Sequence, residues 1–234
     1  MRSLSLLGAF DARLDEKPIK EFESSKVRAL LAYLVVEADK PHSRDKLAGM
    51  FWGELSDETA NKNLRQALSN LRKAIRDEDS DSPLLTVTPA LIQADGRAGW
   101  LDTRAFAALL RETDSHPHRK LETCPACARR MEAALALYRG DFLEGFHVRD
   151  APDFEDWMLT ERARLRELAL QALHRLAEIQ MSRADYPAAL EATSRLLAFD
   201  PWREEAHRQR MSALARAGQR SAALAQYQSC RRVL

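Results

Sequence analysis

The sequence has few cysteines, no long apolar run and almost no net charge. Three cysteines among 234 residues cannot build the disulfide framework of a small secreted protein. No stretch approaches the roughly 18 apolar residues of a membrane-spanning helix, and no basic segment followed by an apolar run marks a secretory signal. We therefore expect a cytoplasmic protein with no membrane partner.

Patterns typical of enzymes are also missing. The eight glycines form no Gly-rich loop of the kind that holds nucleotide phosphates. The neighbouring carboxylates Glu204 and Glu205 alternate with Arg203 and Arg208, as on a solvated helix face, and no nucleophile is arranged beside a base. The sequence predicts a protein that is not an enzyme.

The segment from Thr59 to Arg76 contains no acidic residue and is the most informative part of the chain. Its apolar residues recur at helical spacing within an arc of about 120°, which predicts one core-facing stripe; they are Leu64, Ala67, Leu68, Leu71, Ala74 and Ile75. The opposite face carries only amides, hydroxyls and cations. Gln, Asn and Arg can bind base edges in the major groove, and Lys and Arg can neutralise phosphates. This pattern favours a DNA-recognition helix over the alternative, an ordinary solvated helix.

Shorter elements surround this helix in a recognisable order. Helical patterns over residues 25–38 and 43–51 precede it, as a helix-turn-helix requires. Strand-like runs over residues 4–10 and 11–22 come first, and a hairpin around Pro89 comes last. A small sheet, three helices and a terminal hairpin make up a winged helix, in which the hairpin is the wing.

Residues after Trp100 follow a helical period almost throughout. The triplet Ala188-Ala189-Leu190 recurs as Ala222-Ala223-Leu224, an offset of 34 residues, which is the period of tetratricopeptide (TPR) repeats. We therefore expect an α+β winged helix-turn-helix in residues 1–99, followed by an all-α, TPR-like helical repeat domain in residues 100–234. Stacked repeats of this kind provide surfaces for protein contacts.

The chain resembles bacterial regulators of the antibiotic regulatory protein type, which join a response-regulator-type (OmpR-like) winged helix to a helical bacterial transcriptional activator domain. The resemblance covers nearly the whole chain and rests on five segments in the family's order: FESSKVRALLAYL, DKLAGMFW, NLRQALSNLRKAI, LYRGDFLEGF and DPWREEAHRQRMSALARAGQRSAALAQYQ. It implies sequence-specific binding to double-stranded promoter DNA and control of transcription, with activation as the expected direction.

The resemblance also implies which residues bind DNA. It makes Thr59 to Arg76 the recognition helix. The positions that it places near the bases are Lys62, Asn63, Arg65, Gln66, Ser69 and Asn70, with Asn63 near the edge of the exposed face. Three further cations suit phosphates: Arg72, Lys73 and Arg76. Arg97, just after the predicted hairpin, is either a wing arginine for the minor groove or a solvated turn residue.

The positive charge of the predicted DNA-binding domain is local. The whole chain has a formal net charge of +1, and residues 1–100 carry 15 Lys and Arg against 16 Asp and Glu. One cationic helix face makes few phosphate contacts, so we expect a homodimer, tandem binding on DNA or contact with RNA polymerase to add affinity. The same near-neutrality leaves an alternative open: a non-DNA-binding interaction or regulatory module of a larger ATPase-type regulator.

One cluster of soft ligands lies outside the predicted DNA-binding helix. In the run HPHRKLETCPAC, His116, His118, Cys124 and Cys127 fall within twelve residues. A Cys-x-x-Cys pair can occupy two corners of a tetrahedral zinc site, and the two histidines can supply the others. The alternative is a polar loop with two exposed histidines and two reduced thiols. The predicted zinc is structural; a metal-sensing regulator would need zinc to change DNA affinity.

Overall fold

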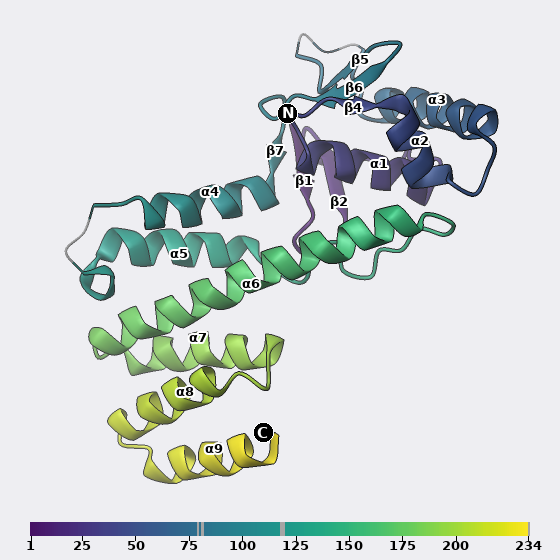
Figure 1. The fold of residues 1–234 in the computed structure, drawn as a ribbon. Helices are drawn as coiled ribbons and strands as arrows, with labels where there is room; N and C mark the ends of the chain where they lie inside the picture. The colour runs from purple at the N-terminus through teal and green to yellow at the C-terminus, as the bar shows by residue number, and fades with distance from the viewer. Residues whose placement is uncertain (79, 81, 118–119, 234) are drawn as a thin grey trace. The chain divides into compact units, whose positions relative to one another are not determined.

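The computed structural model describes residues 1–78, 80, 82–117 and 120–233 (Figure 1). The chain divides into two compact units. Unit 1 comprises Met1–Ala105 and Arg139–Arg164, and unit 2 comprises Phe106–Tyr138 and Leu165–Leu234. This division differs from the expected ranges 1–99 and 100–234 because a second, later segment of the chain packs into unit 1.

A four-stranded sheet opens unit 1, in the order β3-β2-β1-β7. Its strands are β1 (Arg2–Ser5), β2 (Asp11–Leu14), β3 (Lys17–Pro18) and β7 (Trp100–Leu101). β1 and β2 are antiparallel, whereas β7 lies parallel to β1. The sheet thus joins the first residues of the chain to residues that follow the wing.

The first strand is shorter than the run 4–10 that the sequence predicts. It ends at Ser5 because the carboxylate of Asp102 accepts the backbone N–H groups of Leu6 and Leu7, at 2.8–2.9 Å, which removes them from the strand ladder. Gly8 then takes a left-handed conformation (φ 113°). Burial raises the pKa of Asp102 above its usual value, although these N–H groups act in the opposite direction.

Three helices follow, and their positions agree with the sequence patterns. They are α1 (Ser25–Val36), α2 (Arg44–Trp52) and α3 (Asp57–Ala74). Each begins after a serine whose side-chain oxygen accepts a backbone N–H three residues later: Ser24, Ser43 and Ser56. α3 also carries two acidic residues in its first turn, where they stabilise the positive end of the helix.

The predicted hairpin forms the wing. It consists of β5 (Leu85–Val87) and β6 (Leu91–Ala94), and β6 also pairs with the short strand β4 (His42–Ser43), which gives the order β4-β6-β5. Thr88 closes the turn, because its hydroxyl donates to the carbonyl of Leu91 and accepts the N–H of the same residue. β4 fixes the wing to the start of α2.

Aromatic side chains explain why residues 139–164 belong to unit 1. Helix α6 (Pro152–Ser182) begins in this segment. Its Trp157 ring lies 4.9 Å from the ring of Tyr33 on α1, and its Nε1 donates to the Glu37 carboxylate at 3.3 Å. Phe154 packs 5.3 Å from Phe51 of α2. Such aromatic contacts bury large areas and complete the core of unit 1.

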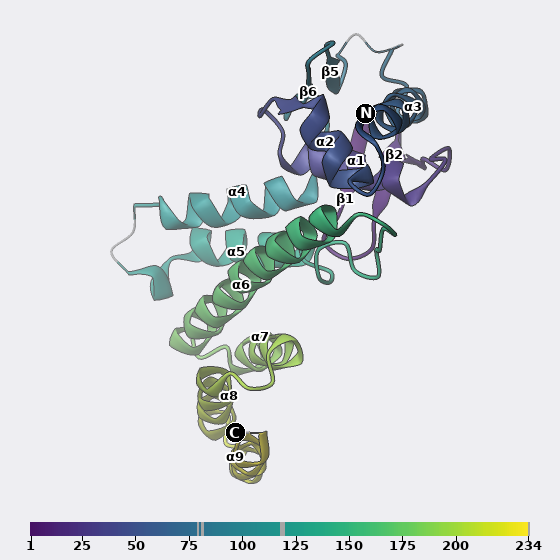
Figure 2. The same cartoon turned by 45° about the vertical axis from the view of Figure 1, so that its right-hand side comes forward.

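The described residues of unit 2 form helices and connecting loops. Besides the rest of α6, its elements include most of α4 (Asp102–Asp114), the short η1 (Leu121–Thr123), α5 (Pro125–Leu137), α7 (Tyr186–Phe199), α8 (Glu204–Arg216) and α9 (Arg220–Val233). α7 packs on α8 and α8 on α9, as both views show (Figure 2). The predicted fold class, an α+β winged helix followed by an all-α region, is confirmed, while the TPR assignment stays a prediction.

Among the residues that the structure describes, no helix is both long enough and apolar enough to cross a membrane.

Candidate nucleic-acid interface

Helix α3 buries its apolar stripe and exposes a polar, cationic face. Leu64, Leu68 and Leu71 are buried, as the helical period predicts. Most of the predicted DNA-binding residues are exposed: Lys62, Arg65, Gln66, Ser69, Lys73 and Arg76. Asn63 is half-buried at the edge of this face. Beyond the two acidic residues of its first turn, α3 carries no carboxylate.

Asn70 does not belong to the exposed face, and its predicted role near the bases is wrong. Asn70 is only 8% exposed. Its Oδ1 accepts the backbone N–H of Glu23 at 3.1 Å, and its Nδ2 donates to the carbonyl of Glu21 at 3.2 Å. The amide therefore satisfies the extended backbone before α1, which lies 47 residues earlier in the sequence.

Replacing Asn70 by alanine is expected to reduce stability and leave base preference unchanged. The change leaves two part-buried backbone groups without partners, which costs about 1–3 kcal/mol. Urea denaturation measures this loss, and the matched control is Ser69→Ala on the exposed face, which should change stability by less than about 0.5 kcal/mol. If Asn70→Ala instead changes base preference and keeps full stability, Asn70 contacts DNA after all.

Arg72 is already engaged by an acidic neighbour. Its side chain is 35% exposed, and its Nη1 lies 3.1 Å from the Glu78 carboxylate. A DNA phosphate would have to compete with this carboxylate, whereas Lys73, one residue later, is exposed. Lys73 is thus better placed than Arg72 for a phosphate contact.

The cation beside the tip of the wing is Arg44 and not Arg97. Arg97 follows β6, at the end of the strand remote from the tip, where its N–H donates to Asp95 at 2.8 Å. Arg44, the first residue of α2, donates from Nε to the carbonyl of Thr88 at 3.0 Å. No sequence pattern points to Arg44, because only the pairing of β4 with β6 brings α2 to the wing.

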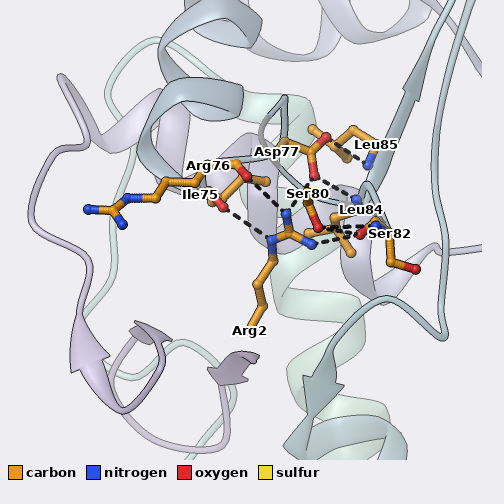
Figure 3. Close-up of polar contacts among 8 residues, drawn as sticks. All are labelled: Arg2, Ile75, Arg76, Asp77, Ser80, Ser82, Leu84 and Leu85. Carbon is orange, nitrogen blue, oxygen red and sulfur yellow. Dashed lines mark hydrogen bonds and ion pairs between the residues drawn. The ribbon is translucent and has the colours of Figure 1, made fainter.

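A buried arginine closes the C-terminal end of α3 (Figure 3). The Arg2 guanidinium donates to the carbonyls of Ile75 and Arg76, each at 3.1 Å, and to that of Ser82 at 2.9 Å. It also lies 3.3 Å from the carboxylate of Asp77. Carbonyls at the end of a helix lack intrahelical partners, and the guanidinium provides donors for those of the C-cap residue Ile75 and of Arg76 after it.

Asp77 extends this arrangement to the wing. Its carboxylate accepts the N–H of Leu84 at 2.6 Å and that of Leu85, the first residue of β5, at 3.1 Å. Arg76 adopts a left-handed conformation (φ 49°) that ends the helix, and its own guanidinium extends away from the cluster (Figure 3). We call the buried pair Arg2 and Asp77 the Arg2–Asp77 clamp; it fixes the end of the candidate recognition helix to the wing.

Three of the four predicted metal ligands come together in unit 2. The ligand atoms of His116, Cys124 and Cys127 lie within 4.8 Å of one another, whereas His118 lies outside the described residues. The backbone N–H of Cys127 lowers the pKa of the Cys124 thiol, and burial raises the pKa of the Cys127 thiol.

A winged helix with an exposed cationic helix, followed by a helical region, defines a class of DNA-binding transcriptional regulators. Residues 23–90 match the family model described as "Transcriptional regulatory protein, C terminal", and residues 101–234 match that of the "Bacterial transcriptional activator domain". The chain belongs to the bacterial transcriptional activator domain family. Its proteins are transcriptional regulators and not enzymes, and the resemblance to the antibiotic regulatory protein type is confirmed.

The chain is also similar to individual proteins from bacteria. It is 28% identical over 214 residues to the regulatory protein AfsR of Streptomyces coelicolor, covering 90% of this chain and 20% of AfsR. The chain therefore spans about a fifth of the length of this curated relative. The solved structure of Mycobacterium tuberculosis EmbR, described in complex with a low affinity phosphopeptide, superposes with a TM-score of 0.76. That match covers 99% of this chain and 58% of the EmbR chain at 24% identity, so it shows a common fold.

Proposed function

We propose that this chain binds promoter DNA sequence-specifically through α3 and activates transcription. The exposed face of α3 carries the proposal, because it combines base-reading side chains with cations and has no carboxylate beyond its first turn. Lys62, Arg65, Gln66 and Ser69 recur at i, i+3, i+4 and i+7, so they share one side of the helix. Arg and Gln on such a face match guanine and adenine edges in the major groove.

Phosphate contacts would flank this reading face. Lys73 lies in the last turn of α3, Arg76 lies just after that helix, and Arg44 of α2 lies beside the wing tip. Contacts to phosphates set the register of a protein on the duplex without reading sequence. The number of such contacts is small, which agrees with the near-neutral charge of residues 1–100.

Unit 2 is proposed to supply protein contacts that raise affinity and activate transcription. α7 and α9 start 34 residues apart, as TPR-like pairs do. Trp202 is 68% exposed, and Leu224 and Tyr227 are 65% and 51% exposed. Exposed aromatic and aliphatic side chains of this kind are typical of protein interfaces. A second copy of the chain, in a homodimer or in tandem on DNA, and RNA polymerase are the proposed partners.

The phosphate contacts can be tested without knowing the target sequence. Fluorescence anisotropy with a mixed-sequence duplex gives the slope of log binding constant against log salt. Lys73→Ala should reduce this slope by about 1, because one phosphate contact and its released counterion are lost. Arg208→Ala is the matched control, since its side chain is 68% exposed on α8, and it should leave the slope unchanged.

Two results would contradict the proposal. Equal slopes for the wild type and Lys73→Ala would remove Lys73 from the interface. If the wild type does not bind duplex DNA at low salt, the alternative holds, and the chain is a non-DNA-binding interaction module of a larger regulator.

A further inference from the structure

The loop between α4 and α5 brings three soft ligands together. His116 lies two residues after the end of α4. Cys124 is the residue before α5, and Cys127 lies in the first turn of that helix. Both cysteines are buried and His116 is half-buried. Ligands from both ends of one loop therefore converge on a sheltered point within unit 2.

The two nitrogen–sulfur distances match those of a tetrahedral zinc site. Zinc–sulfur bonds of about 2.3 Å and zinc–nitrogen bonds of about 2.0–2.1 Å, at a tetrahedral angle, place sulfur and nitrogen about 3.6 Å apart. His116 Nδ1 lies 3.6 Å from Cys124 Sγ and 3.6 Å from Cys127 Sγ. Both ligand pairs thus already have the spacing of a coordination shell.

One imidazole nitrogen, His116 Nδ1, faces both thiols. An imidazole nitrogen offers one lone pair or one N–H, so it forms one good hydrogen bond and not two. Here two thiols lie at equal distance from the same nitrogen. The carbonyl of Thr113, a further acceptor for Cys127, is 3.9 Å from its sulfur. A metal ion satisfies all three ligands at once, because each occupies its own corner.

We propose that His116, Cys124 and Cys127 bind a structural zinc ion that fixes the loop between α4 and α5. On binding, the two thiols release their protons to solvent, and two thiolates with a neutral imidazole balance the double charge of the ion. The fourth corner takes water or a ligand beyond these three residues. No oxidation or reduction takes place.

A structural role follows from the position of the site. Cys124 is the residue immediately before α5, so a ligand bond from its sulfur acts at the start of that helix. Between Asp114 and Pro125, the only described regular element is the three-residue η1. A metal ion that joins His116 to Cys124 and Cys127 would close this loop and align the start of α5 with the end of α4.

Metal analysis of the untagged protein tests the proposal. The wild type, purified without chelator, should contain about one zinc ion per chain when its metal content is measured by inductively coupled plasma mass spectrometry. Cys124→Ser and His116→Ala should lose it. Cys230→Ser is the matched control, because Cys230 is a buried cysteine on α9 and should not affect zinc content. Equal zinc content in Cys124→Ser and Cys230→Ser would overturn the proposal.

A second measurement avoids the risk that a variant does not fold. Chelator should lower the melting temperature of the wild type, and added zinc should restore it. Cobalt added to the metal-free wild type should give the intense visible bands of tetrahedral coordination and the near-ultraviolet bands of thiolate ligation. Absence of these bands, an unchanged melting temperature, or a disulfide between Cys124 and Cys127 in place of metal would each overturn the proposal.

Discussion

Asp77→Ala is expected to lower the free energy of unfolding by about 3–5 kcal/mol. The reason is that removal of this carboxylate leaves the buried positive charge of Arg2 without its ion-pair partner. The Arg2 guanidinium would stay buried without its carboxylate, and the N–H groups of Leu84 and Leu85 would lose their acceptor. Denaturant titration, monitored by tryptophan fluorescence, measures the loss. The unfolding of unit 1 should shift to a lower denaturant concentration.

A surface ion pair of the same unit provides the matched control. Arg13 and Asp11 lie 2.8 Å apart, but their side chains are 49% and 35% exposed. Asp11→Ala should therefore cost about 0–1 kcal/mol. If both aspartate variants lose the same small amount, the Arg2–Asp77 clamp does not hold α3 to the wing.

Arg65→Ala is expected to weaken binding to the preferred DNA sequence by about 1–3 kcal/mol, or roughly 5- to 160-fold, if its guanidinium reads a base. Preference at one base position should relax at the same time. Gln66→Ala should behave similarly at another position. Competition with duplexes that differ at single bases measures both the lost affinity and the lost discrimination.

Lys73→Ala is the internal comparison for these variants. A phosphate contact carries no sequence information, so this change should weaken all duplexes similarly. If Arg65→Ala and Gln66→Ala leave both affinity and base preference unchanged, the reading face has been assigned to the wrong side of α3.

Local sequence patterns were sufficient to predict the three helices α1, α2 and α3 of unit 1. Ser43 and Ser56 cap α2 and α3 in the structure, because a short hydroxyl side chain satisfies free N–H groups wherever the chain enters a helix. The period of the leucines in α3 likewise predicted its buried stripe. Such features depend on neighbours within one or two turns, and the sequence shows those neighbours directly.

Contacts between distant parts of the chain were not predictable in this way. Asn70 is polar and lies near the border of the stripe, so its burial depends on Glu21 and Glu23, which the helical period does not place. Arg2 meets Asp77 only because the sheet and the end of α3 meet. Short strands such as β4 and β7 have two residues each and leave almost no sequence pattern.

The proposed metal ligands combine a local sequence signal with a contact that depends on the fold. The Cys-x-x-Cys spacing and the nearby histidines were visible in the sequence, and the structure brings His116, Cys124 and Cys127 together. The sequence did not show that His116 faces the thiols, because that depends on how the loop returns to the start of α5.

Selection of bound duplexes from a random DNA pool, at near-physiological salt, tests most directly whether α3 reads sequence. The wild type should enrich one motif, and a direct or inverted repeat would reveal how two copies pair on DNA. Arg65→Ala, selected in parallel, should lose preference at one position of that motif. If neither protein enriches a motif, α3 does not read DNA, and the chain acts through protein contacts alone.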